Sequence, residues 1–245
     1  MNADGPDEPW PLTGSGRVGL VVMRCQPLTR GHAGLLCIAL QDCDTVIVGL
    51  GSTQLARVRR HPFSFEQRRD MLRLVFGDAL KTIPLVDIHS DPSTDEWVDY
   101  VLDRIRELAL PEPTDYFTGS PEDARWYVNR FARLDDPATT VGPVTTHRSQ
   151  RTGARLHVLD RRFTELPPAA EIRSMIERRN PEWQLYVPAR ICRYVDWYYP
   201  PELRDPIRAG TPPDAKTVPP GTRLIREDGT LLLRDDTGAW VAQSG

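Results

Sequence analysis

The sequence predicts an α/β fold, in which a parallel β-sheet is covered by helices on both faces. Two continuous apolar runs, Val18–Met23 and Thr45–Leu50, are typical of strands that are buried on both sides. Between them, apolar side chains recur at helical spacing from Gly31 onward. A strand, a helix and a second strand in this order form a βαβ unit with parallel strands. The α/β fold class therefore follows from the two apolar runs and the helix that connects them.

Composition excludes several classes of function. Lysines and arginines number 31 and aspartates and glutamates 34, for a net charge of −3, which argues against nucleic-acid or membrane binding by charge. No apolar run reaches membrane-spanning length, and residues 1–15 are polar and acidic, unlike a signal peptide. The four cysteines contain no C-x-x-C pair and are expected to be reduced, so we expect a cytoplasmic protein.

The loop after the first strand carries the first functional signal. It runs from Arg24 to Arg30 and is followed by Gly31 and His32, which begin the helical run. The first N–H groups of a helix have no internal partner, and the helix dipole favours an anion there. Arg24 and Arg30 add positive charge, and His32 adds a hydrogen-bond donor. The segment therefore predicts a phosphate site.

Further elements follow from periodicity and caps. Ser64 and Gln67 form a capping-box pattern ahead of a helix. His147 and His157 lack the carboxylate or thiol spacing of a metal site and are expected to be core or surface residues. The remaining strands are expected at 82–89, 116–118, 139–144 and 156–159, with a basic loop at 146–154, and the remaining helices at 94–109 and 174–179.

Composition also divides the chain. Residues 1–15 are expected to be a flexible arm, because they are rich in Gly, Pro and acidic residues. Residues 16–199 form the α/β domain, and the Pro-rich stretch 200–221 is expected to be a linker. Residues 222–245 read as a small β meander with turns at Asp228-Gly229 and Thr237-Gly238.

Two motifs resemble a known enzyme family. The loop M-R-C-Q-P-L-T-R-G-H resembles the phosphate motif of the HxGH/TxGH nucleotidyltransferase superfamily, with Met23 and Cys25 in place of the usual Gly and Phe. The segment H-P-F-S-F-E-Q-R is similar to that of archaeal-type nicotinamide mononucleotide (NMN) adenylyltransferases and their Nudix-fused relatives, with His61 in place of Asn. No Nudix box is present in this sequence.

Three later segments resemble the same branch. An Asp at a strand end, Asp87 or Asp91, precedes the pair Trp97-Val98, and the family places this Trp against the nicotinamide ring. Gly119 and Asp123 match a later G-x-x-x-D segment. The family also has a second phosphate-binding motif, which contains a Ser and a Thr and ends in an Ile-Arg or Val-Arg pair. This sequence has the closing pair, Ile172-Arg173, but Pro168 and Ala170 replace the usual Ser and Thr.

The resemblance implies a Rossmann-like nucleotidyltransferase fold and the reaction of ATP with NMN, or with nicotinic acid mononucleotide, to form the dinucleotide and pyrophosphate. It implies Mg²⁺ bound with ATP and no metal site made by the protein, and it leaves a homo-oligomer open. Its implied catalytic residues are His32, Thr29, Arg24 and Arg173; the implied ATP contacts are Gln26, Pro27, Gly31, Gly119, Asp123 and Ile172; the implied NMN contacts are Trp97, Asp87, Arg68 and Phe63.

Other interpretations stay open. Trp97 fits core packing as well as ring stacking, and Asp123 fits an acid favoured by a helix dipole. The enzyme could belong to the superfamily but use CTP or another acceptor. The loss of two hydroxyls at Pro168 and Ala170 also fits a nucleotide-binding sensor without turnover.

Overall fold

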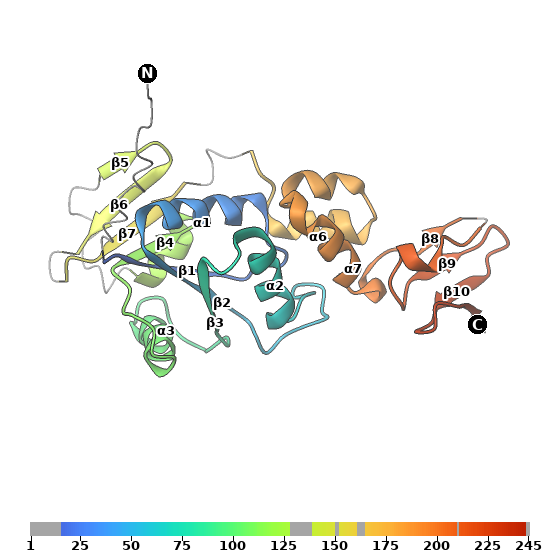
Figure 1. The fold of residues 1–245 in the computed structure, drawn as a ribbon, viewed down its shortest axis with the longest axis horizontal. Coiled ribbons are helices and arrows are strands. Elements are labelled where there is room, and N and C mark those ends of the chain that lie inside the picture. Colours follow the sequence, from blue (N-terminus) through green and yellow to red (C-terminus); the bar gives the residue numbers. More distant parts are fainter. Residues whose placement is uncertain (1–15, 128–138, 150–151, 161–164, 210, 244–245) are drawn as a thin grey trace, which may run out of the picture.

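The computed structural model describes residues 16–127, 139–149, 152–160, 165–209 and 211–243, so the arm expected at residues 1–15 lies outside the described residues. The main sheet has seven strands in the order β3-β2-β1-β4-β7-β6-β5. Strands β1 to β4 and β7 are parallel, and β5 and β6 are antiparallel (Figure 1). The strands are β1 Val18–Met23, β2 Thr45–Leu50, β3 Leu80–Pro84, β4 Asp115–Thr118, β5 Thr139–Val141, β6 Val144–Arg148 and β7 Arg155–Leu159.

Helices cover both faces of this sheet, as the sequence predicted. One apolar core contains side chains from α1, α2, α6 and α7, and a second core on the other face contains side chains from α3, α4 and the short helix η1. The main helices are α1 Arg30–Asp42, α2 Phe65–Phe76, α3 Glu96–Glu107, α4 Pro121–Ala124, α6 Ala169–Glu177 and α7 Cys192–Tyr198, and the 3₁₀ turns are η1 Arg125–Tyr127, η3 Pro181–Tyr186, η4 Ala189–Ile191, η5 Pro201–Leu203 and η6 Ala215–Thr217.

Helices α1 and α2 each begin at a capping box. The Ser64 hydroxyl accepts from the Gln67 N–H at the start of α2, and the Gln67 side chain accepts from the Ser64 N–H, so the predicted capping box is confirmed. At α1 the cap is Thr29, and His32 takes the place of the usual Glu or Gln. Each box satisfies two helix-start donors, which fixes where the preceding loop must end.

Gly49 shows why the centre of the sheet is tightly packed. A Cβ at this position in β2 would lie 2.6 Å from Leu85 Cδ1 and 3.1 Å from Val22 Cγ2. A side chain at this position would have to displace the Leu85 and Val22 side chains, so glycine allows both of them to pack against the strand. The loop of Gly51 and Ser52 that follows β2 is thereby held against the end of β1, where Gly51 N–H donates to Met23 O over 3.1 Å.

A buried carboxylate ties together the amino ends of the parallel strands. Asp115 is fully buried, and its oxygens lie 2.6 Å from Arg17 Nη2, 2.8 Å from Arg155 Nε and 2.8 Å from His157 Nε2. The Thr114 hydroxyl donates a further bond of 2.8 Å. Burial alone raises the pKa of Asp115, but the hydrogen bonds from these partners outweigh it, and the net shift is strongly downward.

The C-terminal region forms a separate small sheet of four strands in the order β11-β10-β9-β8, at one end of the long axis in Figure 1. Strands β9 Arg223–Ile225, β10 Leu231–Arg234 and β11 Trp240–Ala242 form the predicted antiparallel meander. Gly229 and Gly238 have positive φ in its two turns. The stretch expected to be a linker contributes β8 Ile207–Arg208, which pairs with β9 in parallel.

Several element bounds differ from the sequence predictions. The third strand ends at Pro84, so 85–89 is loop, because proline cannot donate to the ladder. The strand expected at 139–144 is a hairpin that turns at Gly142, where φ is 56°, and the basic segment expected as a loop supplies β6. Helix α6 begins at Ala169 and not at 174, because the predicted loop already has helical conformation.

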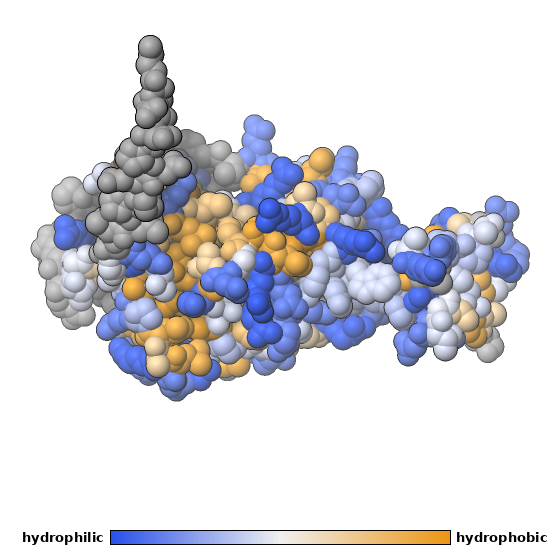
Figure 2. Space-filling view, viewed as in Figure 1, coloured by the Kyte–Doolittle hydropathy of each residue, from blue (hydrophilic) through white to orange (hydrophobic). Residues whose placement is uncertain are grey.

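No helix in the described ranges is both long and apolar enough to cross a bilayer. Figure 2 shows hydrophobic residues gathered over the α/β domain on the face drawn, whereas the C-terminal sheet is mainly hydrophilic there.

Candidate active site

The loop between β1 and α1 lies at the carboxyl edge of the parallel strands, where ligands bind in open α/β sheets. His32 is fixed at the start of α1 by three contacts with Thr29. The His32 N–H donates to Thr29 Oγ1 over 3.2 Å, and His32 Nδ1 lies 3.0 Å from Thr29 Oγ1 and 3.2 Å from the Thr29 backbone N. Because a backbone N–H can only donate, Nδ1 accepts, and the hydrogen of the neutral ring is on Nε2.

The same loop is clamped by residues far along the chain. The Gln26 side chain makes two bonds of 2.9 Å with the backbone of Phe63, one to its carbonyl and one from its N–H. Arg68 Nη1 donates to Arg24 O over 2.8 Å, and Arg173 Nη1 donates to Gln26 O over 2.8 Å. Three of the segments that carried the family resemblance therefore meet at one loop.

Arg68 and Phe63 lie inside the protein. Arg68 is fully buried, and it also donates to Gly51 O over 2.7 Å and to Ser64 O over 3.2 Å. Burial lowers its pKa, and its Nη2 atom has no hydrogen-bond partner in the described part of the chain. Phe63 is fully buried with its ring against Tyr199, at 5.7 Å between centroids. Both residues join the loops around the site.

Asp87 is held beside the loop that follows β2. Its Oδ1 accepts from the Ser52 hydroxyl over 2.8 Å, and its Oδ2 accepts from Gln54 Nε2 over 3.2 Å. The Asp87 N–H in turn donates to Gln54 Oε1 over 3.2 Å. Asp91, the alternative match, caps a turn by accepting from the Ser93 N–H over 2.8 Å. The structure thus gives Asp87 the more ordered surroundings at the end of β3.

Trp97 belongs to an aromatic cluster. It is half-buried at the start of α3, with its ring centroid 5.4 Å from Trp126 and 5.6 Å from Tyr127. Tyr127 is buried and contacts Tyr116 of β4 at 5.4 Å. The Tyr100 hydroxyl accepts from the Val86 N–H over 2.9 Å, which holds α3 beside the loop that carries Asp87.

The two remaining segments with predicted ATP contacts, at Gly119–Asp123 and at Ile172, lie near the starts of helices α4 and α6. Gly119 is followed by Ser120, whose hydroxyl caps α4 and donates to Asp123 Oδ2 over 2.9 Å. Asp123 is exposed, so its carboxylate reaches solvent next to this cap.

Helix α6 begins at Ala169, and its N-cap residue, Pro168, offers no side-chain cap. The first backbone bonds of α6 run from Glu171 and Ile172 to Pro168 O, so the amides of Ala169 and Ala170 precede them. Leu166, just before this start, would lie 3.7 Å from a Cβ at Gly31, which places the beginning of α6 against the beginning of α1.

The predicted residues thus fall into two groups. Those gathered around the starts of α1 and α6 are Arg24, Gln26, Pro27, Thr29, Gly31, His32, Ile172 and Arg173, with Arg68 and Phe63 behind them. Those on the α3 and α4 side are Asp87, Trp97, Gly119 and Asp123. Sequence reasoning did not anticipate the Thr29–His32 cap, although T-x-x-H at a helix start differs from a capping box only in its last residue.

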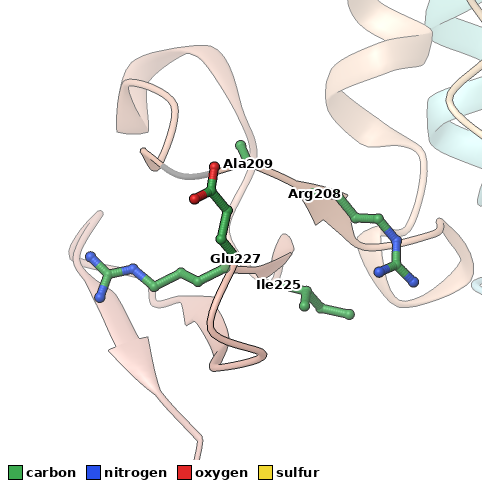
Figure 3. A pocket seen from close by; sticks show the side chains of 5 residues that line it. Arg208, Ala209, Ile225 and Glu227 are labelled. Atoms are coloured by element: carbon green, nitrogen blue, oxygen red, sulfur yellow. The ribbon is translucent and has the colours of Figure 1, made fainter.

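The described residues contain no group of three or more His, Cys, Asp or Glu that could hold a metal ion. A cavity of about 270 Å³ lies in the C-terminal sheet, lined by Arg208, Ala209, Ile225, Arg226 and Glu227. The side chains of Arg208 and Glu227 do not converge there (Figure 3), and the cavity is remote from the loop at α1. We therefore place the candidate site at that loop.

Comparison with known proteins supports this location. Residues 24–180, well over half of the chain, match the cytidylyltransferase-like family. The nicotinamide-nucleotide adenylyltransferase of Pyrococcus horikoshii is 32% identical over 117 residues, which are 46% of this chain and 59% of that one. The enzyme of the same name from Thermococcus kodakarensis is 33% identical over 93 residues, 36% of this chain and 48% of that one. The matched part thus spans roughly half of these relatives, whose name agrees with the resemblance in the sequence.

A solved structure shows the same fold. The bifunctional NMN adenylyltransferase/ADP ribose pyrophosphatase of Francisella tularensis aligns with a TM-score of 0.52 and 21% identity, over 70% of this chain and 44% of that one. The same protein complexed with AMP and a manganese ion aligns with a TM-score of 0.50 and 22% identity. The family match over residues 24–180 shows that the chain belongs to the cytidylyltransferase-like family.

Proposed function

We propose that this protein transfers AMP from ATP to NMN and so forms NAD and pyrophosphate. The observation that carries the proposal is the cap of α1, where Thr29 holds His32 Nδ1 as an acceptor and leaves the ring hydrogen on Nε2. A donor that is fixed at a helix N-terminus is suited to charge that develops on phosphate oxygens. The names of the relatives support the choice of NMN as acceptor.

The reaction needs positioning and charge neutralisation, and no protein nucleophile. A 5′-phosphate oxygen of NMN attacks the α-phosphorus of ATP, and the bond from that phosphorus to the oxygen bridging to the β-phosphate breaks as pyrophosphate leaves. In this proposal His32 donates to the α- and β-phosphate oxygens. Arg24, which is exposed, and Arg173, which is clamped to Gln26 O, neutralise the departing pyrophosphate.

The donor set fits a metal that enters with its substrate. No cluster of three or more ligating side chains is found among the described residues, and Mg²⁺ ordinarily uses phosphate oxygens and water with few protein ligands. We therefore propose Mg²⁺ bound to ATP, where it would supply further neutralisation of the phosphates. The F. tularensis protein solved with AMP and a manganese ion supports a divalent metal.

The acceptor base is proposed to lie at Trp97. An aromatic face attracts the delocalised positive charge of a pyridinium ring, and Trp126 and Tyr127 hold the Trp97 ring in place. The Asp87 carboxylate is close to this part of the chain and would repel a carboxylate on the base. We therefore propose NMN ahead of nicotinic acid mononucleotide.

Since NAD synthesis uses cytoplasmic ATP, we expect the protein in the cytoplasm.

One observation favours a second candidate, a nucleotide sensor without turnover. Pro168 offers neither a hydroxyl nor an N–H at the start of α6, and Ala170 offers no hydroxyl. A protein that bound ATP or NAD through α1 alone would retain affinity and lack catalysis. The two candidates differ in turnover and not in binding, so one assay separates them.

The test measures NAD formation from ATP, Mg²⁺ and NMN by a coupled dehydrogenase, with the variants His32→Ala and His147→Ala. We expect wild-type turnover, and a kcat lowered by about 10²–10³-fold in His32→Ala, as for other lost charge-stabilising donors. His147 lies in β6, away from the α1 loop, so His147→Ala should keep its kcat. Binding of ATP or NAD without turnover would support the sensor instead.

A further inference from the structure

His61 is a buried histidine that the proposed mechanism does not use. Its side chain is only 5% exposed, and its Nδ1 atom has no hydrogen-bond partner within the described residues. A buried nitrogen without a partner is costly, so it calls for a ligand or another explanation. The sequence marks the same residue, since His61 stands where the resembling family has Asn.

The backbone fixes His61 beside the phosphate loop. His61 ends a tight turn that begins at Val58, with bonds of 2.8 and 3.2 Å between the two backbones. Two residues later, Phe63 is held by both bonds from the Gln26 side chain. On its outer side the turn is fastened to α6 by Arg59, whose Nε lies 3.2 Å from Glu177 Oε2. The backbone that carries His61 is therefore held both by its own turn and by the neighbouring contacts of Phe63 and Arg59.

The charges around His61 come from both ends of the candidate site. Burial lowers the pKa of His61, Arg24, Arg60 and Arg68 lower it further, and Asp87 acts in the opposite direction. The ring is therefore neutral at pH 7. Arg24 belongs to the end proposed for phosphate and Asp87 to the end proposed for the base, so His61 lies within electrostatic range of both.

We propose that His61 binds the ribose of the acceptor mononucleotide through a hydrogen bond to one of its hydroxyl groups. In a mononucleotide the ribose connects the base to the 5′-phosphate, which matches a residue influenced by both ends of the site. A hydroxyl can donate to or accept from a neutral imidazole, whereas an anion is better met by the neighbouring arginines. This inference rests on the proposed function and adds a specificity for ribonucleotides.

The test compares His61→Leu, His61→Asn and the matched control His147→Leu. His147 Nδ1 is likewise buried without a partner in the described ranges, but it lies in β6. Three quantities are measured for each protein: KM for NMN, KM for ATP and the melting temperature. A fourth is the affinity for NMN relative to its 2′-deoxy and 3′-deoxy analogues, obtained by calorimetric titration.

We expect His61→Leu to raise KM for NMN at least tenfold, to leave KM for ATP within twofold, and to keep or raise the melting temperature, because an unsatisfied buried nitrogen is removed. His61→Asn should restore KM for NMN to within about threefold of wild type, since an amide can make the same bond. Wild type should prefer NMN over one of the deoxy analogues by about tenfold, which corresponds to one hydrogen bond to the ligand, and His61→Leu should lose that preference.

Two outcomes would overturn the inference about His61 while the proposed function stands, provided that the wild type is active. One is an unchanged KM for NMN in His61→Leu, and the other is a KM for NMN that rises as much in His147→Leu as in His61→Leu. A drop in melting temperature with no change in the preference for NMN over both deoxy analogues would make His61 purely structural. If wild type neither forms NAD nor binds NMN, the proposed function fails first, and this inference fails with it.

Discussion

The two edges of the parallel sheet carry polar networks of opposite character. At the amino edge, the Asp115 carboxylate is buried and bonded by Arg17, Thr114, Arg155 and His157. At the carboxyl edge, the network around the α1 loop is also rich in charged groups. It nevertheless leaves two buried nitrogens, His61 Nδ1 and Arg68 Nη2, without partners in the described part of the chain.

The difference distinguishes stability from function. A network whose carboxylate is bonded by several donors holds strands together and offers nothing to a ligand. A network with unpartnered donors carries a cost in the folded protein, and such costs are typical of sites that a ligand completes. Changes at the amino edge should therefore alter unfolding, and changes at the carboxyl edge should alter kinetics.

The largest effect is expected from Asp115→Asn. It removes the charge that pairs with Arg17 and Arg155 and should lower the free energy of unfolding by about 3–5 kcal/mol, the usual cost of breaking a buried ion pair. KM and kcat of the folded fraction should stay near wild type. Urea unfolding measures the free energy of unfolding, and the coupled assay of NAD formation measures KM and kcat. Asp42→Asn is the control, because the Asp42 side chain is 43% exposed and its carboxylate lies 3.9 Å from Arg17 Nη2, farther than that of Asp115. A large kinetic defect in Asp115→Asn would contradict the separation of the two edges.

Arg173→Leu should give the converse result. The variant loses the bond to Gln26 O and a positive charge beside the phosphates, so kcat/KM should fall by about 10–150-fold, or about 1.5–3 kcal/mol for a charged hydrogen bond. Burial lowers the pKa of Arg173, so replacing it with an apolar side chain removes a desolvated charge and should change unfolding little. Arg178→Leu is the control for the assay, because Arg178 is the exposed C-cap residue of the same helix and no bond from it to the α1 loop is seen in the described part of the chain. Equal losses in both variants would mean that α6 as a whole is perturbed.

Acid should weaken the amino edge by a smaller amount. The folded pKa of Asp115 lies below its unfolded value, so its contribution is complete above that unfolded value and is lost as the pH falls below it. For an unfolded pKa of about 3.9, the loss at pH 3 is about 1.3 kcal/mol. Urea unfolding between pH 7 and pH 3 should show this extra loss in wild type relative to Asp115→Asn. Parallel curves for the two proteins would exclude Asp115 as its source.

The smallest effect is expected from the double variant Pro168→Ser and Ala170→Thr. It supplies two hydroxyl donors and one N–H at the start of α6, where the resembling family holds the ATP phosphates. KM for ATP should fall about fivefold, close to 1 kcal/mol for one net hydrogen bond. The KM for NMN serves as the internal control and should stay constant. If neither the KM for ATP nor the KM for NMN changed, the backbone amides of residues 169 and 170 would already bind the phosphates without hydroxyl groups, or ATP would not reach α6.

Most of the local structure could be predicted from the sequence. The strands Val18–Met23 and Thr45–Leu50, the helix capped by Ser64 and the turns at Gly229 and Gly238 all depend on residues close together in the chain. The start of α6 was placed five residues too late, because a proline followed by two alanines looks like a loop in sequence but forms a capless helix start. The residues predicted for the site near α1 come from one local motif, and the structure places them together at the starts of α1 and α6.

The α/β class and the residues of the loop between β1 and α1 could be read from the sequence alone, because both depend on local periodicity, caps and spacing. Which of those residues hold the loop in place depends on contacts between distant parts of the chain. Gln26 meets Phe63 across 37 residues, Arg68 meets Arg24 across 44, and Arg173 meets Gln26 across 147. Partners at such separations are chosen by how the sheet and its helices pack. The same packing buries His61 and leaves its Nδ1 atom without a hydrogen-bond partner among the residues that the structure describes.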